Sequence, residues 1–112
     1  MNKEMTFKEY QEQALITATY PATLRITYPT LGLNGEAGEV AEKVKKLYRD
    51  HDGVIDSVFL ENVKLELGDV LWYVSAICRD LGISMEDVAR ANIEKLHSRR
   101  ERGVIHGNGD SR

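Results

Sequence analysis

The sequence predicts an all-α protein in which four helices form a bundle within one domain. Apolar residues recur at spacings of three and four in separate segments, and residues that cap helix termini stand at the ends of most of these segments. Alternation of apolar and polar residues, which would indicate strands, does not stand out. Four helices with short connections favour a bundle.

The first predicted helix begins after Thr6 and runs towards Tyr20. Thr6 and Glu9 form the capping-box pattern, in which a threonine is followed three residues later by a glutamate. Pro21 ends this helix. The stretch from Pro21 to Pro29 is interpreted as a loop or irregular turn, although its β-branched residues would also suit a short strand.

The second predicted helix begins near Thr30 or Leu31 and continues to about Arg49. Turn-forming residues follow it, including an aspartate and a glycine at positions 52 and 53. These residues separate the second helix from the third, so we expect a helical hairpin at this point.

The third predicted helix is capped by Asp56 or Ser57 and is the most apolar of the set. It ends at Leu81, because Gly82 stands in the position where glycine commonly terminates a helix.

The fourth predicted helix begins after Ser84, which forms a second capping box with Asp87, and it ends before Gly103. Basic residues gather in its last turns, where they complement the helix dipole. The remaining stretch is rich in glycine and poor in apolar residues. We therefore expect one helical domain over residues 1–102 and a tail or flap over residues 103–112, which could close over a ligand.

Composition excludes several classes of protein. No apolar run approaches the roughly 18 residues of a membrane helix, and the first ten residues lack the apolar core of a secretory signal. We expect a cytoplasmic protein with no membrane partner. The formal charge of −3 argues against binding to long nucleic acid. The single cysteine, Cys78, is predicted to serve in packing.

The same five-residue frame occurs twice, as EAGEV at residues 36–40 and as ELGDV at residues 66–70. On a helix, residues three apart share a face. Each frame therefore presents two carboxylates on one helix face, together with apolar residues that point inward. Most charge pairs of this kind lie on solvated faces, but here the acids align with core positions. The four acids are Glu36, Glu39, Glu66 and Asp69.

Clustered carboxylates that face a core are costly unless a cation lies among them. Carboxylate ligands favour hard divalent metals, so Mg²⁺ is the expected cofactor and Mn²⁺ a possible substitute. Gly38 and Gly68 each cost roughly 1 kcal/mol inside a helix relative to alanine. We interpret them as points where another backbone or a ligand comes close.

These motifs resemble a known family. The E-x-x-E and E-x-x-D pairs, within GLNGEAGEVAEKVKKLYRD and ELGDVLWYVSAICRDLGIS, are similar to the signature of the all-α nucleoside triphosphate pyrophosphohydrolases, the MazG-like and dUTPase/dCTPase-related group. The resemblance is closest to short, single-domain MazG-like proteins. It covers the chain from about Tyr10 to the C-terminus.

The resemblance implies hydrolysis of a nucleoside triphosphate between its α- and β-phosphates, giving the monophosphate and pyrophosphate. Glu36, Glu39, Glu66 and Asp69 would hold Mg²⁺ and serve in catalysis, with one incompletely engaged carboxylate accepting a proton. Which of the four does so stays open. The family also implies a homodimer or homotetramer with sites near the subunit contact.

Substrate-binding candidates lie on three helices. Asn92, Lys95 and Arg99 form one stripe on the fourth helix and could bind phosphate, or the basic residues could simply complement the dipole. Lys43 shares the face of the first acidic pair and could touch phosphate or balance the acids. Trp72 could stack on a nucleobase, although aromatic residues in bundles more often belong to the core.

Two other classes remain as alternatives. Glu94 and His97 supply one E-x-x-H step of a di-iron site, but such sites need two steps, and no second one is present. A non-catalytic helical adaptor with an acidic metal-binding face is the second alternative. Intact function after an alanine substitution at one of the motif acids would favour it.

Overall fold

The computed structural model describes residues 4–112, and within them the chain forms four α-helices and two short 3-10 helices. The elements in chain order are α1 (Phe7–Ala14), η1 (Leu15–Thr17), η2 (Ala22–Leu24), α2 (Thr27–His51), α3 (Ser57–Leu81) and α4 (Met85–Arg102). The described part of the chain contains no strand, so the all-α prediction is confirmed. The first three residues of the domain predicted over 1–102 lie outside this description.

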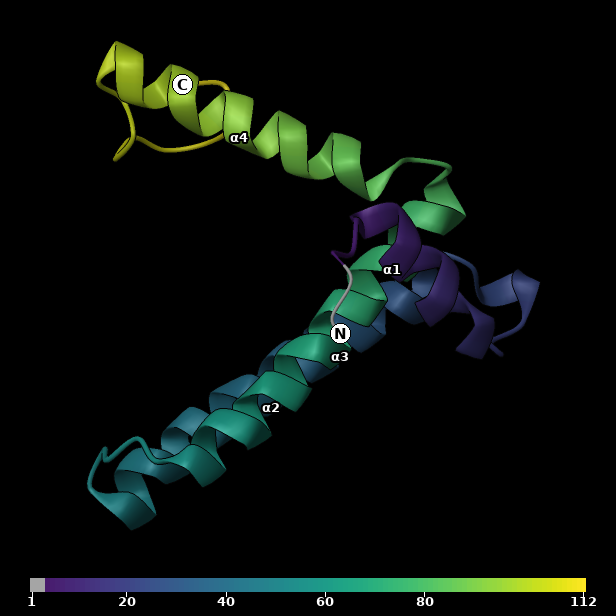
Figure 1. Ribbon diagram of the computed structural model, residues 1–112. Coiled ribbons are helices and arrows are strands. Elements are labelled where there is room, and N and C mark those ends of the chain that lie inside the picture. Colours follow the sequence, from purple (N-terminus) through teal and green to yellow (C-terminus); the bar gives the residue numbers. More distant parts are fainter. Residues whose placement is uncertain (1–3) are drawn as a thin grey trace.

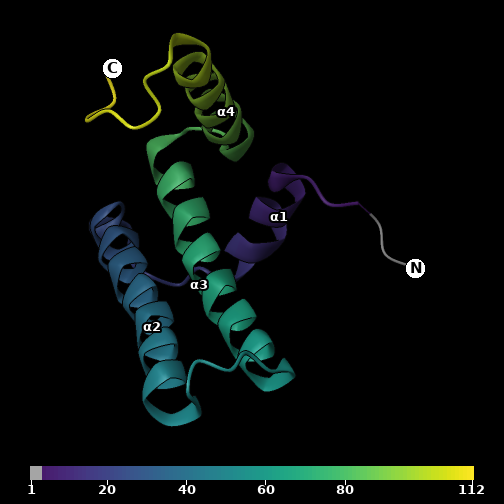
Figure 2. The same cartoon turned by 90° about the vertical axis from the view of Figure 1, so that its left-hand side faces the viewer.

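The helices α2 and α3 form a long antiparallel hairpin, which carries most of the tertiary contacts of the chain (Figures 1 and 2). The short helix α1 packs across α3 and also contacts the start of α4. There, the backbone N–H of Lys8 donates to the Glu86 carboxylate at 2.9 Å. Beyond this contact α4 extends away from the hairpin. Within one chain, α4 therefore contacts the other helices mainly through α1.

Most helix ends follow from local sequence. The side chains of Thr6, Asp56 and Ser84 accept hydrogen bonds from the backbone N–H groups three residues ahead, as predicted. Gly82 and Gly103 end α3 and α4 in the left-handed conformation, with φ of 69° and 71°.

The first helix is shorter than predicted. It ends at Ala14 and continues only as the 3-10 turn η1. The Ala14 carbonyl, which could extend the helix, instead accepts hydrogen bonds from the Trp72 indole N–H at 3.0 Å and from the Thr17 hydroxyl at 2.6 Å. A contact made across 58 residues therefore replaces the next helical turn.

The second helix begins at Thr27, earlier than predicted, with Pro29 in its first turn. Proline is tolerated there because the first turn has no intrahelical partner for its N–H. Ile26 adopts φ 66° and ψ −54°, and the Thr27 N–H donates to the Arg25 carbonyl at 2.7 Å, which closes a γ-turn. A β-branched residue at positive φ is strained. The side chain of Asp80 holds this turn by accepting from the Ile26 N–H at 2.9 Å.

Asp80 links the loop before α2 to the end of α3. Its side chain is 7% exposed, accepts from the Tyr20 hydroxyl at 2.8 Å and pairs with Arg79 at 3.5 Å. Burial alone would raise the pKa of this carboxyl. The hydrogen bonds from Ile26 and Tyr20 and the charge of Arg79 outweigh burial and lower the pKa below 3.8.

The apolar core is small. Within residues 4–112, the buried apolar side chains are Pro29, Leu47, Ala76, Cys78 and Met85. The packing role predicted for Cys78 is confirmed, and burial raises the pKa of its thiol. No helix of the described chain is both long and apolar enough to cross a membrane.

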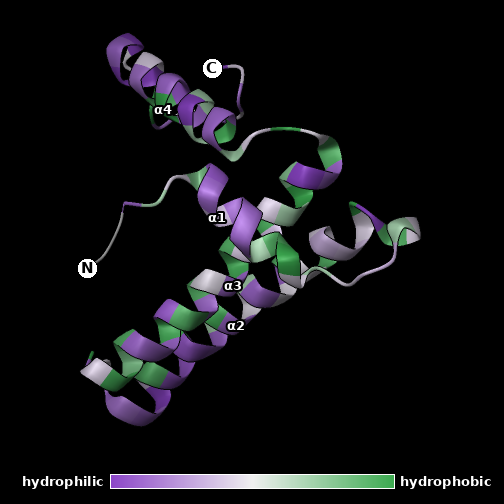
Figure 3. Ribbon diagram, turned by 45° about the vertical axis from the view of Figure 1, so that its right-hand side comes forward, coloured by the Kyte–Doolittle hydropathy of each residue, from purple (hydrophilic) through white to green (hydrophobic). Residues whose placement is uncertain are grey.

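Much apolar surface remains exposed. Hydrophobic residues are spaced along both helices of the hairpin (Figure 3), and Leu31, Val58, Leu65 and Leu67 are all more than half exposed. The radius of gyration is 17.0 Å, against about 13 Å for a compact chain of this length. The accessible surface is 8495 Å², about 2,300 Å² more than the scaling for monomeric proteins gives at 12.7 kDa.

Candidate active site

Three acids from the two repeated frames meet between α2 and α3. Glu36 comes from α2, and Glu66 and Asp69 come from α3. Each offers a carboxylate oxygen, and these oxygens all lie within 4.8 Å of one another. The helical spacing aligns Glu66 with Asp69, and the antiparallel pairing of the helices places Glu36 opposite them. Among residues 4–112 this is the one group of at least three His, Cys, Asp or Glu side chains with that geometry.

Glu39 lies outside the close group. It is exposed on the next turn of α2, although its charge still acts on Glu36. The structure thus brings together three of the four predicted metal ligands. Glu94 and His97, the residues of the di-iron alternative, belong to no such group in the described chain.

The acids repel one another. Burial is the largest cause that raises the pKa of Glu36, and the charges of Asp69, Glu66 and Glu39 raise it further. The adjoining cavity has a volume of about 330 Å³ and is lined by Thr17, Glu36, Asp69, Trp72 and Tyr73. No Lys, Arg or His of residues 4–112 lines it. A hard divalent cation suits this arrangement, because oxygen ligands converge where no side chain neutralises their charge.

Aromatic side chains form one wall of this cavity. Trp72 and Tyr73 meet edge to face with ring centroids 5.0 Å apart, and Tyr28 lies 6.4 Å from Tyr73. The Trp72 indole N–H is occupied by Ala14 and Thr17, so the polar edge of Trp72 is fixed towards α1 and η1. Trp72 therefore lines the same cavity as Glu36 and Asp69. Its contact with a nucleobase remains a prediction.

Close helix approach occurs at Gly32, one turn before the first frame. A Cβ on Gly32 would overlap the ring of Tyr73, whereas a Cβ on Gly38 or Gly68 would meet nothing within 4 Å. The suggestion that the two motif glycines let a neighbouring backbone approach is therefore wrong within this chain. The open space beside them leaves the approach of a ligand as a prediction.

The fourth helix does not reach the acids within one chain. Asn92 is exposed, and Lys95 and Arg99 bind Asp110 of the C-terminal tail. None of these residues lines the acidic cavity, and α4 projects away from the hairpin (Figures 1 and 2). Their predicted role in binding substrate needs either movement of α4 or a second copy of the chain.

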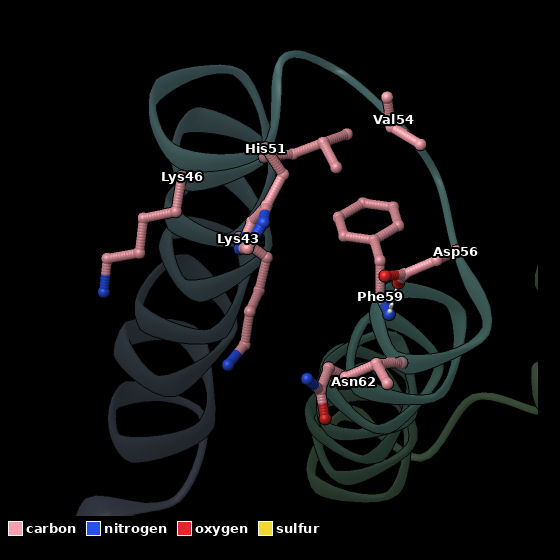
Figure 4. Close-up of a pocket in the computed structure, with 9 residues that line it drawn as sticks. Lys43, Lys46, His51, Val54, Asp56, Phe59 and Asn62 are labelled. Carbon is pink, nitrogen blue, oxygen red and sulfur yellow. Dashed lines mark hydrogen bonds between the residues drawn. The ribbon is translucent and has the colours of Figure 1, made fainter.

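Lys43 lines a different cavity, at the closed end of the hairpin (Figure 4). This cavity has a volume of about 400 Å³. Its lining combines basic, polar and apolar side chains, namely Lys43, Lys46, Leu47, His51, Val54, Asp56, Val58, Phe59 and Asn62.

Thr17 and Tyr10 are neighbours of the acids that sequence reasoning missed. Thr17 lines the acidic cavity, and the pKa of Tyr10 is raised by burial and then by the charge of Asp69. Both belong to the α1 and η1 segment, which bears no acidic motif. Only the packing of that segment on α3 would have identified them.

Comparison with protein families shows the family of this chain. Residues 27–104 match the MazG nucleotide pyrophosphohydrolase domain. The chain belongs to the MazG family. It is also 46% identical over 109 residues to "Gene 37 protein" of Mycobacterium phage L5, in an alignment that covers 92% of this chain and 96% of the phage protein. No solved structure matches it.

The MazG domain match begins at the first residue of α2 and ends two residues after α4. It includes all four motif acids and the candidates Lys43, Trp72, Asn92, Lys95 and Arg99. It leaves out α1, η1 and most of the tail. Thr17, which lines the acidic cavity, and Asp110, which binds α4, are therefore features of this chain outside the matched MazG region.

Proposed function

We propose that this MazG-family protein hydrolyses nucleoside triphosphates between the α- and β-phosphates, giving a nucleoside monophosphate and pyrophosphate. The observation that carries the proposal is the convergence of Glu36, Glu66 and Asp69 from the two repeated frames of a MazG domain. Carboxylate clusters of this kind bind the divalent metals that accompany substrate phosphates.

Glu36, Glu66 and Asp69 would hold Mg²⁺, or Mn²⁺ in its place, and Glu39 on the next turn would complete the set. The mutual repulsion of the three acids supports this assignment, because a divalent cation would convert that repulsion into attraction. Bound Mg²⁺ supplies charge neutralisation at phosphate oxygens and activation of water.

The side chains around the acids would orient the nucleotide. Trp72 and Tyr73 offer aromatic surface at the acidic cavity for stacking against a base. The α-phosphate would lie nearest the carboxylates.

Self-association would supply the missing cations. The surface excess of about 2,300 Å² falls in the range that one subunit buries in an obligate interface. A neighbouring copy is thus a suitable source of Asn92, Lys95 and Arg99, and we expect a homodimer or homotetramer. Lys43 could bind phosphate only if the nucleotide extends along the hairpin towards its closed end.

Pyrophosphate release from a panel of nucleoside triphosphates tests the function. With Mg²⁺ the natural protein should release pyrophosphate, and Glu66→Gln should lower the rate on the order of 100-fold or more. Glu61→Gln is the matched control, because Glu61 is an exposed glutamate on the same helix that pairs only with Lys64, at 3.4 Å. It should keep the natural rate.

Metal binding gives a readout besides activity. Mn²⁺ titration monitored by electron paramagnetic resonance should show a bound ion in the natural protein and in Glu61→Gln, with weaker binding in Glu66→Gln. Bound metal without cleavage of any triphosphate would favour the adaptor with an acidic metal-binding face. Equal Mn²⁺ binding by all three proteins would overturn the assignment of Glu66.

A further inference from the structure

The C-terminal tail folds back on α4 as a compact loop. The guanidinium of Arg112 organises it by donating to the carbonyls of Val104, Ile105 and Gly109. The carbonyl of Arg112 in turn accepts from Arg102 at 2.8 Å. The last residues of the chain are thereby held against the basic end of α4 (Figure 1).

One carboxylate in this loop, that of Asp110, binds two cationic side chains. The Oδ1 atom of Asp110 lies 3.0 Å from Lys95 Nζ and 2.9 Å from Arg99 Nη2. Arg99 Nη2 also donates to the Gly109 carbonyl at 3.2 Å. The Asp110 side chain is 83% exposed, so solvent can reach it, whereas the Arg99 side chain is only 5% exposed.

Arg99 is left partly unsatisfied. Its Nε atom is buried and has no hydrogen-bond partner within the described chain. In a guanidinium, Nε and Nη2 form one donor edge. Arg49 uses both atoms of this edge to bind the two oxygens of Asp50, each at 2.8 Å. Arg99 uses only Nη2 for Asp110. A larger oxyanion could accept from both atoms and still reach Lys95.

We propose that Lys95 and Arg99 form a phosphate-binding site and that Asp110 occupies it in the free protein, so the tail must leave before a phosphate group can bind. A phosphate has more acceptor oxygens than the single carboxylate oxygen that now bridges the two cations. The tail is then an internal competitor for the anion.

This inference rests on the proposed function for the phosphate-binding role of Lys95 and Arg99 and for the ligand, a nucleoside triphosphate or the pyrophosphate formed from it; the competition by Asp110 is new. The competing residue lies in the tail, beyond the part of the chain that matches the MazG domain.

Pyrophosphate binding without metal tests the proposal. In EDTA the acidic cluster cannot recruit pyrophosphate through a cation, so calorimetric titration reports on basic sites. Asp110→Asn should bind pyrophosphate roughly tenfold more tightly than the natural protein, because a competing charged hydrogen bond is removed. Asp87→Asn is the matched control. Asp87 is an exposed acid on α4, the helix that carries Lys95 and Arg99, and it pairs with Arg90 at 3.3 Å. This variant should bind like the natural protein.

Two further measurements locate the effect. Lys95→Gln should abolish the tighter binding when combined with Asp110→Asn. Hydrogen exchange of residues 104–112 in the natural protein should become faster when pyrophosphate binds, because the tail is displaced. This second readout holds even if Asp110→Asn lowers the stability of the chain.

Three outcomes would overturn the proposal. If Asp110→Asn and the natural protein bind pyrophosphate with equal affinity, Asp110 only holds the tail against α4 and does not compete with the anion. Weaker binding, or slower exchange of the tail with pyrophosphate, would mean that the tail closes over the anion. Binding that is insensitive to Lys95→Gln would place the anion elsewhere. If the protein cleaves triphosphates but Asp110→Asn does not change pyrophosphate affinity, the hydrolase proposal stands and the competition by Asp110 fails. If Asp110→Asn binds pyrophosphate more tightly but no triphosphate is cleaved, the anion site stands and the hydrolase proposal fails.

Discussion

The contact between Gly32 and Tyr73 links the packing of the hairpin to the acidic cavity. Gly32 lies under the ring of Tyr73, and a Cβ built on Gly32 would overlap three ring carbons. Tyr73 also lines the cavity that contains Glu36 and Asp69. Gly32→Ala should therefore displace Tyr73 and disturb both the hairpin and the site.

The expected magnitude follows from two opposing effects. Forcing a methyl group into a packed position costs roughly 1–3 kcal/mol, whereas alanine gains about 1 kcal/mol over glycine in a helix. Subtracting the helix gain from the packing cost leaves a net loss of up to about 2 kcal/mol of unfolding free energy at Gly32. At Gly38, in the same helix, nothing lies within 4 Å of the added methyl. Gly38→Ala should therefore gain about 0.5–1 kcal/mol.

Urea unfolding followed by circular dichroism measures this difference. Protein concentration must be held constant, because self-association contributes to apparent stability. Gly32→Ala should unfold at a lower urea concentration than the natural protein and Gly38→Ala at a higher one. Steady-state kinetics should also show a raised KM for Gly32→Ala, since Tyr73 is moved.

A stabilised Gly32→Ala would refute the close packing of Tyr73 on α2. A destabilised Gly38→Ala would show that a second subunit covers Gly38, contrary to the open space around it. Unchanged stability with lower activity for Gly38→Ala would instead indicate that the nucleotide approaches this glycine.

The remaining predictions concern Asp80, Trp72 and self-association. Asp80→Asn should lower the unfolding free energy by about 2 kcal/mol, because a neutral amide replaces the buried carboxylate that accepts from Tyr20 and Ile26 and pairs with Arg79. The pKa of Asp80 is lower in the folded state than in the unfolded state. The difference in unfolding free energy between the natural protein and this variant should therefore be fully present above about pH 5. Urea unfolding at several pH values should show this free-energy difference decreasing as the pH falls below 3.8 and through the folded pKa. Trp72→Phe removes the donor to the Ala14 carbonyl and should cost about 1 kcal/mol, whereas a loss below 0.3 kcal/mol would contradict that hydrogen bond. Sedimentation velocity should find an assembly larger than the 12.7 kDa chain at micromolar concentration, and a stable monomer would contradict the argument from exposed apolar surface.

The sequence predicted those elements whose causes are local. Thr6, Asp56 and Ser84 cap their helices through groups three residues away, so each start could be read from a short segment. The start of α2 could not, because Asp80 holds the Ile26 N–H from 54 residues further along the chain. Proline at position 29 suggested a loop, but it lies in the first helical turn.

The candidate site also contains residues whose positions follow from local sequence and residues whose positions do not. Helical spacing alone places Glu66 and Asp69 on one face, and the hairpin brings Glu36 opposite them. The position of Lys95 depends on how α4 packs, and its contact with Asp110 depends on a tail with no regular structure. Neither depends on a periodic pattern, so spacing along the sequence could not reveal them.

The most direct test of the central claim is phosphorus-31 NMR of a nucleoside triphosphate panel incubated with the protein and Mg²⁺. The claim is that the repeated acidic frames form one metal-dependent site for cleavage between the α- and β-phosphates. Monophosphate and pyrophosphate should appear together in equal amounts with the natural protein and with Glu61→Gln, and should form on the order of 100-fold more slowly or not at all with Glu66→Gln. Formation of diphosphate and inorganic phosphate, or equal turnover by Glu66→Gln, would contradict it.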